Sequence, residues 1–376
     1  MRLLFCLYKY FPYGGLQRDF KNIAIESLKR GHDINVFTTK WIGDVPEGFK
    51  LELIKVKGLT NHGRSLSFSN RLVKFTESNK FDMIIGFNKM SCLDVYYAAD
   101  PCYKSKAIEG RGYFYKFSNR YRTYVYLENE VFSPKSRTHI LLLSKREKEN
   151  FIKYYNTPEN RFHLLPPGIS KDRYVLKNRE DIRSGIRNEL NIKEDDHLLL
   201  MIGSGFKTKG VDRAIRAISS LSKPVRNKTK LVIIGDGRKK KFEELAKELN
   251  VDENVRFLGG REDIHRFLVG ADLLIHPAYS ENTGTVLIEA IVNGLPVLAS
   301  DVCGYASYVE DSNSGLLIPS PFKQEVFNGL LEYMLTSIKY NDWKQSGLEY
   351  GKKHDFFSMY TKAVDIIEDL ARVKVK

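Results

Sequence analysis

Two glutamates separated by seven residues are the first side chains in this sequence that could take part in chemistry. Glu281 and Glu289 lie in the stretch 276–304, HPAYSENTGTVLIEAIVNGLPVLASDVCG. One apolar strand precedes this pair and another follows it, so the segment between the strands is expected to form a helix. Glu281 would stand just before the helix and Glu289 about two turns inside it. Such carboxylates accept hydrogen bonds from hydroxyl groups, but the same spacing also fits an amphipathic helix with two solvated acids.

The start of this helix has the composition of an anion-binding site. Asn282 and Thr283 are good N-caps, so we expect the helix to begin near one of them. It should stop at Asn293-Gly294. Gly284 would let a ligand approach the first backbone amides, whose positive potential attracts an anion. An anion-binding helix start beside two carboxylates suits a sugar nucleotide.

Two other segments in the second half place polar groups directly after predicted strands. Lys209 follows the glycine-containing turn that includes Gly205, and its ammonium could neutralise a departing diphosphate. Most lysines, however, are simply exposed on the surface. Arg261 follows two glycines, where exposed backbone could meet the edge of a base. Each signal is weak alone, but all fall at the same edge of one predicted sheet.

The first half offers fewer candidates. Asp100 stands at the end of the predicted strand 93–99, on the sheet edge where α/β proteins bind ligands, but its position alone favours an ordinary Asp-Pro turn with Pro101. Gly14 and Gly15 follow the first predicted strand. They could bring backbone amides close to a phosphate, or they could form an ordinary tight turn.

The whole chain alternates between apolar strands and helices. This pattern indicates an α/β protein with two doubly wound, parallel-sheet domains of Rossmann type, at 1–167 and 168–356. The boundary is set by Pro166-Pro167-Gly168 and the polar stretch that follows it. A last helix, near 357–373, is expected to pack back on the first domain. Strands are predicted at 2–8, 33–39, 49–56, 81–87, 93–99, 139–144, 161–165, 197–202, 231–234, 255–258, 272–275, 296–299 and 316–318.

The composition limits the class of protein. The chain has 376 residues and a formal net charge of +14, from 60 Lys and Arg against 46 Asp and Glu. That charge suits nucleic acid, an anionic membrane surface or a phosphorylated substrate. No apolar run reaches the roughly 18 residues of a membrane span. The four cysteines are scattered without a metal-binding or disulfide pattern, which fits the cytoplasm.

The segment 102–126 is rich in both tyrosine and basic residues. It carries six Lys or Arg and one acid, with eight aromatic residues between them. This mixture favours contact with an anionic membrane surface over a helix with buried aromatic rings, and both over nucleic acid. The candidate membrane contacts are Lys104, Lys106, Arg111, Tyr113, Phe114, Tyr115, Lys116, Arg120 and Arg122.

The motifs together resemble the retaining glycosyltransferases of family 4, which have the GT-B fold of two Rossmann-like domains facing across a cleft. The matching segments are Gly14-Gly15, HLLPPGI at 163–169, Gly203 to Gly210, Gly259-Gly260-Arg261, and the glutamate pair with Gly294-Leu295-Pro296-Val297 behind it. The resemblance covers essentially the whole chain. CLYKYFPYGGLQRDF, GFNKM, LDVYYAAD, GVDR and DVCGYA resemble, more narrowly, the members that add the first outer-core glucose to lipopolysaccharide.

The resemblance implies a role for each candidate residue. Glu289 would hold the ribose hydroxyls, Lys209 the diphosphate, and Glu281 with the following amides the donor sugar. Asp100, Lys209 and Glu281 would be catalytic. The implied donor-binding residues are Gly14, Gly15, Asp19, Gly205, Lys209, Arg261, Glu281, Asn282, Thr283, Gly284 and Glu289.

Two positions depart from the family pattern. Many members carry Arg where this chain has Thr208, so diphosphate binding depends more on Lys209, with Lys207 as a possible substitute. Many relatives place a histidine near the reacting carbon where this chain has Asp100. A histidine that donates a hydrogen bond and a carboxylate that accepts one are not equivalent.

The implied reaction is transfer of glucose, with retention, from UDP-glucose to an inner-core heptose of lipopolysaccharide in an α-1,3 linkage. The phosphorylated inner core and an anionic membrane surface would be partners, with the enzyme on the cytoplasmic face of the inner membrane. The chain contains no DxD motif, so we expect neither a metal nor a cofactor.

A transferase for another sugar or acceptor would keep the same sites. An oxidoreductase is disfavoured by the missing GxGxxG, and a nucleic-acid-binding protein would leave the glutamates without a role.

Overall fold

The chain folds into two compact units. The computed structural model describes residues 1–12, 14–175 and 177–375, without the side chains of Tyr113 and Val375. The first unit comprises Met1–Pro166 together with the segment from Ser358 onward, and the second comprises Pro167–Phe357. The predicted boundary, between 167 and 168, lies one residue from this division.

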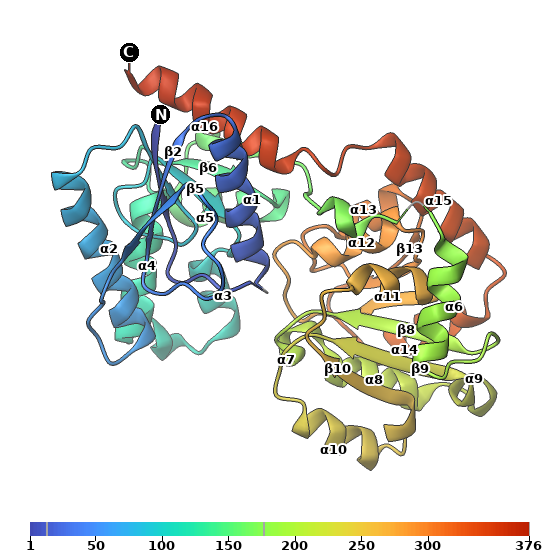
Figure 1. Cartoon of the computed structure of the whole chain (residues 1–376). Helices are drawn as coiled ribbons and strands as arrows, with labels where there is room; N and C mark the ends of the chain where they lie inside the picture. The colour runs from blue at the N-terminus through green and yellow to red at the C-terminus, as the bar shows by residue number, and fades with distance from the viewer. Residues whose placement is uncertain (13, 176, 376) are drawn as a thin grey trace. The chain divides into compact units, whose positions relative to one another are not determined.

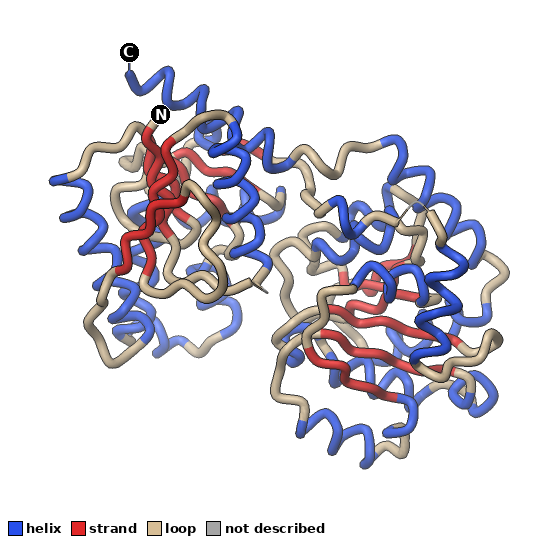
Figure 2. Tube along the Cα trace, in the orientation of Figure 1, coloured by secondary structure: helices blue, strands red, loops and turns tan. Residues whose placement is uncertain are grey.

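The first unit is built on a parallel sheet that has seven strands within the described residues. The strand order is β3-β2-β1-β4-β5-β6-β7, and the sheet is covered by helices on both faces (Figures 1 and 2). Its middle strands are apolar and buried on both sides, as parallel strands beneath helices must be. The strands are β1 (Arg2–Cys6), β2 (Asp33–Thr38), β3 (Phe49–Leu53), β4 (Met83–Gly86), β5 (Val95–Ala98), β6 (His139–Leu142) and β7 (Phe162–Leu164).

The last helix of the chain completes the core of this first unit. In Figure 1 α16 (red) runs beside α1 (blue), and its residues Ala363, Val364 and Ile367 are fully buried in the same cluster as Phe5 and Phe20. The helices of the unit are α1 (Gly15–Lys29), α2 (Asn61–Ser78), α3 (Tyr103–Gly110), α4 (Asn119–Phe132), α5 (Lys145–Tyr155) and α16 (Met359–Val375), with short 3₁₀ turns η1 (Tyr113–Phe117) and η2 (Glu159–Arg161).

The second unit repeats this architecture with a parallel sheet of six strands among the residues described. The strand order is β10-β9-β8-β11-β12-β13. The strands are β8 (His197–Ile202), β9 (Thr229–Ile234), β10 (Val255–Gly259), β11 (Leu273–His276), β12 (Val297–Ser300) and β13 (Gly315–Ile318). The helices are α6 (Arg179–Glu189), α7 (Phe206–Lys209), α8 (Val211–Ser220), α9 (Lys223–Asn227), α10 (Lys240–Glu248), α11 (Ile264–Gly270), α12 (Thr285–Val292), α13 (Ala306–Asp311), α14 (Gln324–Thr336) and α15 (Tyr340–Lys353), with 3₁₀ turns η3 (Lys171–Arg173) and η4 (Asp252–Asn254).

The polar stretch after the predicted boundary is not only a linker. It contains α6, which packs against α11 and buries Ile186 and Arg187, the latter with a side chain only 2% exposed. The Arg187 guanidinium donates to the Asp272 carboxylate at 3.0 Å, just before β11. A charged residue in the buried face hides the apolar periodicity by which helices are recognised.

The predicted fold class of two Rossmann-like parallel-sheet domains is confirmed. The arrangement of the domains across a cleft stays a prediction. Among the described residues, no helix is both long and apolar enough to cross a bilayer.

Candidate functional site

Helix α12 carries the glutamate pair, but it begins later than predicted. It spans Thr285–Val292, and its N-cap is Gly284 rather than Asn282 or Thr283. The reason is the backbone of Gly284, whose φ of +84° is left-handed and interrupts the helix one residue before Thr285. Glu289 consequently lies about one turn inside the helix rather than two.

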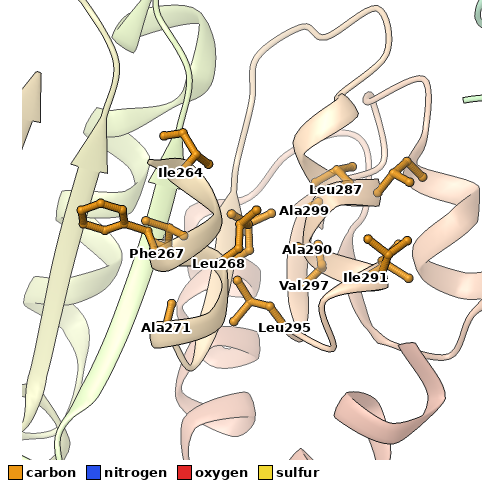
Figure 3. Close-up of a cluster of buried hydrophobic side chains, with 14 of the residues drawn as sticks. Ile264, Phe267, Leu268, Ala271, Leu287, Ala290, Ile291, Leu295, Val297 and Ala299 are labelled. Carbon is orange, nitrogen blue, oxygen red and sulfur yellow. The ribbon is translucent and has the colours of Figure 1, made fainter. Parts of the chain in front are cut away.

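The remainder of α12 is fixed in the core of the second unit. Figure 3 shows Leu287, Ala290 and Ile291 among the buried side chains of this cluster, which also includes residues of α11 and β12. Within this apolar helix Glu289 is only 5% exposed. The structure thus excludes a solvated acid at this position, because a carboxylate so buried must be held by hydrogen-bond donors.

Glu281 forms the centre of a small group of charged and polar side chains. Its carboxylate is paired with the Lys209 ammonium, and its Oε2 lies 3.4 Å from Nε2 of His276. Lys209 ends the short helix α7 after β8, whereas His276 is the last residue of β11. The two strands are neighbours in the sheet, so the carboxyl ends of adjacent parallel strands bring the three side chains together.

Burial decides the charge of His276 in this group. Its side chain is 1% exposed, and burial together with the nearby Lys209 ammonium lowers the pKa of His276 to about 3. The imidazole is therefore neutral at physiological pH. Burial also lowers the pKa of Lys209, whose ammonium is paired with the Glu281 carboxylate.

The other predicted residues of the second unit follow strands β8 and β10 of the same sheet. Gly205 has a left-handed backbone and precedes α7. Lys207 is turned to a surface pair with Asp212 at 2.6 Å, so it does not share the position of Lys209. Arg261 follows β10, where its guanidinium is paired with Asp263 at 2.8 Å and holds the pKa of that carboxyl well below its usual range.

The first unit contains the predicted glycine pair and Asp19. Gly15 begins α1, and a side chain added there would meet no atom within 4 Å, so this backbone is open to a ligand. Asp19 has a structural role, because it accepts hydrogen bonds from the hydroxyls of Tyr97 on β5 at 2.8 Å and Tyr360 on α16 at 3.1 Å. A contact between Asp19 and the donor stays a prediction.

Asp100 is exposed two residues beyond β5, at a cavity of about 280 Å³ on the carboxyl edge of the first sheet. Beside it, Lys89 is bonded to the fully buried Glu128 of α4 at 2.5 Å and to the carbonyl of Pro101 at 2.8 Å. Asp100 is thus placed at a pocket, which a simple Asp-Pro turn would not require. It lies in the first unit and the glutamate pair in the second.

The segment 102–126 divides its side chains between the protein and the solvent. Lys104 donates to the carbonyl of Tyr154 at 3.1 Å, and Tyr115 is hydrogen-bonded to Tyr103 at 2.6 Å. Lys116 is half-buried, and the side chain of Tyr113 lies outside what the structure describes. The exposed candidates are Lys106, Arg111, Phe114, Arg120 and Arg122, of which Phe114 is 83% exposed.

The structure adds residues that the sequence analysis did not select. His276 was not chosen, although its position at the end of a buried strand is the signal that selected Asp100. Glu128 gave no signal, because its burial depends on tertiary packing. No group of three or more His, Cys, Asp or Glu side chains suited to a metal ion occurs among the residues that the structure describes.

Two family models match the chain, one in each half. The model for Glycosyltransferase Family 4 matches residues 13–173, and the model for Glycosyl transferases group 1 matches residues 183–350.

Comparison with known proteins gives a relative of nearly the same length. The lipopolysaccharide glucosyltransferase WaaG of Escherichia coli K12 is 43% identical over 368 residues, which cover 98% of each chain. A crystal structure of WaaG, described as a glycosyltransferase involved in lipopolysaccharide biosynthesis, aligns with a TM-score of 0.93 over 97% of this chain and 99% of that one. The structure of the Anabaena protein HepE in complex with UDP and glucose aligns with a TM-score of 0.75 over 98% of this chain and all of that one. At 18% sequence identity, this similarity shows the fold alone.

The neutral, buried His276 predicts a loss of stability in acid. Unfolded, it takes up a proton near pH 6.5, but folded only near pH 3, so the unfolded state binds the additional proton between these values. The contribution of His276 to the free energy of unfolding is present above pH 6.5 and is lost as the pH falls, by at most about 1.4 kcal/mol per pH unit. Urea denaturation at pH 7 and at pH 5 measures this loss of stability. The variant His276→Asn should show a weaker pH dependence than the wild type, and equal dependence in both would contradict this account.

Proposed function

This chain belongs to the family 4 glycosyltransferases, and we propose that it transfers glucose from UDP-glucose to an inner-core heptose of lipopolysaccharide. The observation that carries the proposal is the match to a lipopolysaccharide glucosyltransferase over almost the entire length of both chains. The enzyme class follows from the family. The donor, the acceptor and the stereochemistry are the proposed parts.

The donor half of the site is assigned to the second unit. Glu281 and the first amides of α12 would bind the glucose, while the buried Glu289 would accept hydrogen bonds from the ribose. Lys209 would exchange its present partner Glu281 for the diphosphate, to which an ammonium binds as a point charge. Arg261 is committed to carboxylates, so the backbone of 259–261 is the part suited to the edge of the uracil.

Retention is proposed to occur by attack on the face from which the nucleotide departs. The bond between the anomeric carbon and the phosphate oxygen breaks, and the acceptor hydroxyl oxygen bonds to the same face of that carbon. The hydroxyl proton passes to the departing phosphate oxygen. The charge that develops on the diphosphate is stabilised by Lys209 and by the helix start, and we propose no metal ion for this task.

The acceptor is proposed to be presented by a membrane. The exposed Phe114 and Phe117, together with the exposed cations of 102–126, form a surface suited to the headgroup region of anionic lipids. The enzyme would then reach its lipid-anchored acceptor from the cytoplasmic face.

Product analysis tests the proposed function directly. Incubation with UDP-glucose, UDP-galactose or UDP-N-acetylglucosamine and heptose-terminated lipopolysaccharide should yield an α-linked glucose on heptose with UDP-glucose alone. Mass spectrometry and NMR identify the sugar and its linkage. Transfer of another sugar would favour the second candidate, a transferase of the same fold with a different donor. A β-linkage would exclude retention.

Removal of either donor-binding charge should reduce transfer. Lys209→Ala should lower kcat by roughly a hundredfold, since it removes charge stabilisation from the departing diphosphate. Glu289→Ala should mainly raise the KM for UDP-glucose, because the ribose is held in the ground state as well as in the transition state. Steady-state kinetics separate the two effects.

The exposed Lys239, which precedes α10, provides a matched control for loss of one positive charge. Lys239→Ala should keep full activity. Wild-type rates in Lys209→Ala at subsaturating UDP-glucose would remove Lys209 from the mechanism.

The proposed membrane surface predicts salt-dependent binding to anionic lipids. The protein should sediment with vesicles that contain phosphatidylglycerol and should be released as ionic strength rises, because salt screens exposed charges. Replacement of Arg111 and Arg122 by Glu should weaken binding to these vesicles. Equal binding to neutral and anionic vesicles would contradict the assignment.

A further inference from the structure

A pocket in the first unit is formed where three neighbouring strands end. Tyr8 follows β1, Asn88 and Lys89 follow β4, and Asp100 follows β5, and these strands are adjacent in the sheet. Helices α3 and α4 close the cavity of about 280 Å³ with further side chains. The carboxyl edge of a parallel sheet is where such proteins bind small molecules.

The walls of this pocket combine aromatic surface with hydroxyl-binding groups. Tyr8, Tyr103 and Tyr124 line it, and the rings of Tyr103 and Tyr124 lie 5.1 Å apart between centroids. Tyrosine rings supply flat apolar surface to the C–H face of a sugar ring. The exposed Asp100 carboxylate can accept hydrogen bonds from sugar hydroxyls.

The charge of the pocket favours an anionic ligand. Lys106 and Arg120 line it and are exposed, and neither has a carboxylate partner in the described part of the chain. Lys89 also lines it, but its charge is compensated by the buried Glu128 at 2.5 Å. Two cations therefore face one carboxylate, Asp100, and a phosphate or carboxylate group bound here would meet charge-assisted hydrogen-bond donors.

The pocket is built on a rigid base. Glu128 accepts hydrogen bonds from the backbone amides of Tyr103 and Lys104, at 2.8 and 3.0 Å, and from the hydroxyl of Tyr155 at 2.5 Å. This buried carboxylate joins the start of α3 to α4 and, through Lys89, to the strand ends. Lys106 and Arg120, which line the cavity, lie on these two joined helices.

We propose that this pocket binds a sugar bearing an anionic substituent. Resting on the proposed function, we assign this sugar to the core oligosaccharide of the acceptor, close to the heptose that is glucosylated. Helices α3 and α4 also belong to the aromatic and basic segment 102–126, so one stretch of chain would contact the membrane and bind the sugars anchored in it. The anion is a phosphate ester or the carboxylate of a sugar acid.

Acceptor kinetics with a soluble oligosaccharide test the pocket without the membrane. The acceptor is a deacylated, heptose-terminated core oligosaccharide, used with saturating UDP-glucose. Lys106→Ala and Arg120→Ala should each raise the KM for this acceptor about tenfold, since a charge-assisted hydrogen bond is lost, while the KM for UDP-glucose stays unchanged. Arg120→Lys, which retains the charge, should recover part of the loss. Lys153→Ala removes an exposed cation of the same unit outside the pocket and should match the wild type.

Phosphatase treatment of the acceptor separates the two sources of charge. If the anion is a phosphate, phosphatase treatment should raise the acceptor KM of the wild type. The wild type and Lys106→Ala should then have the same KM for the treated acceptor. If the anion is a carboxylate, the treatment should change nothing, and the effect of Lys106→Ala should persist. An acceptor KM in both alanine variants equal to that of Lys153→Ala would overturn the proposal.

Calorimetric titration of the oligosaccharide separates failure of the pocket from failure of the proposed function. Binding by the wild type that weakens about tenfold in Lys106→Ala supports the pocket even if no glucose is transferred. In that case the proposed acceptor reaction fails and the binding site stands. Absence of oligosaccharide binding to the wild type would overturn the pocket.

Discussion

Parallel pairing of the strands is the constraint on which both candidate sites depend. In each sheet all strand ends of one polarity lie along one edge, so residues far apart in the sequence become neighbours by following neighbouring strands. Lys209 and His276 are 67 positions apart in the chain, yet both contact Glu281 because β8 and β11 are paired. Asn88 and Asp100 meet at the other pocket for the same reason. The chemistry in each unit therefore depends on register and strand order rather than on any single motif.

Much of the fold was predictable, because strands buried on both faces appear as continuous apolar runs. Some predicted strands are too long, because apolar residues stay buried beyond the end of the strand. Leu7, for example, is fully buried but follows β1. Helix α6 was missed because its inner face includes Arg187, whose charge is matched by Asp272 across the tertiary structure.

The site was predictable to the level of its motifs but not of its contacts. The motifs predict Glu281, Glu289 and Lys209 at one edge of a sheet. The helix start was predicted at Asn282 or Thr283, because the residue type alone does not show whether a glycine is left-handed or lies in the first turn of a helix. The neutrality of His276 follows from burial, which a lone histidine in a sequence does not reveal.

The return of α16 to the first unit has a consequence for how the chain is made. Buried residues 363, 364 and 367 complete a core whose strands were synthesised some two hundred or more residues earlier. The second unit is one continuous segment, Pro167–Phe357, and all its described strands are translated before α16. The first unit thus completes its core after the strands of the second have been made, and until α16 has been translated the apolar face that this helix covers is a surface for chaperones to shield.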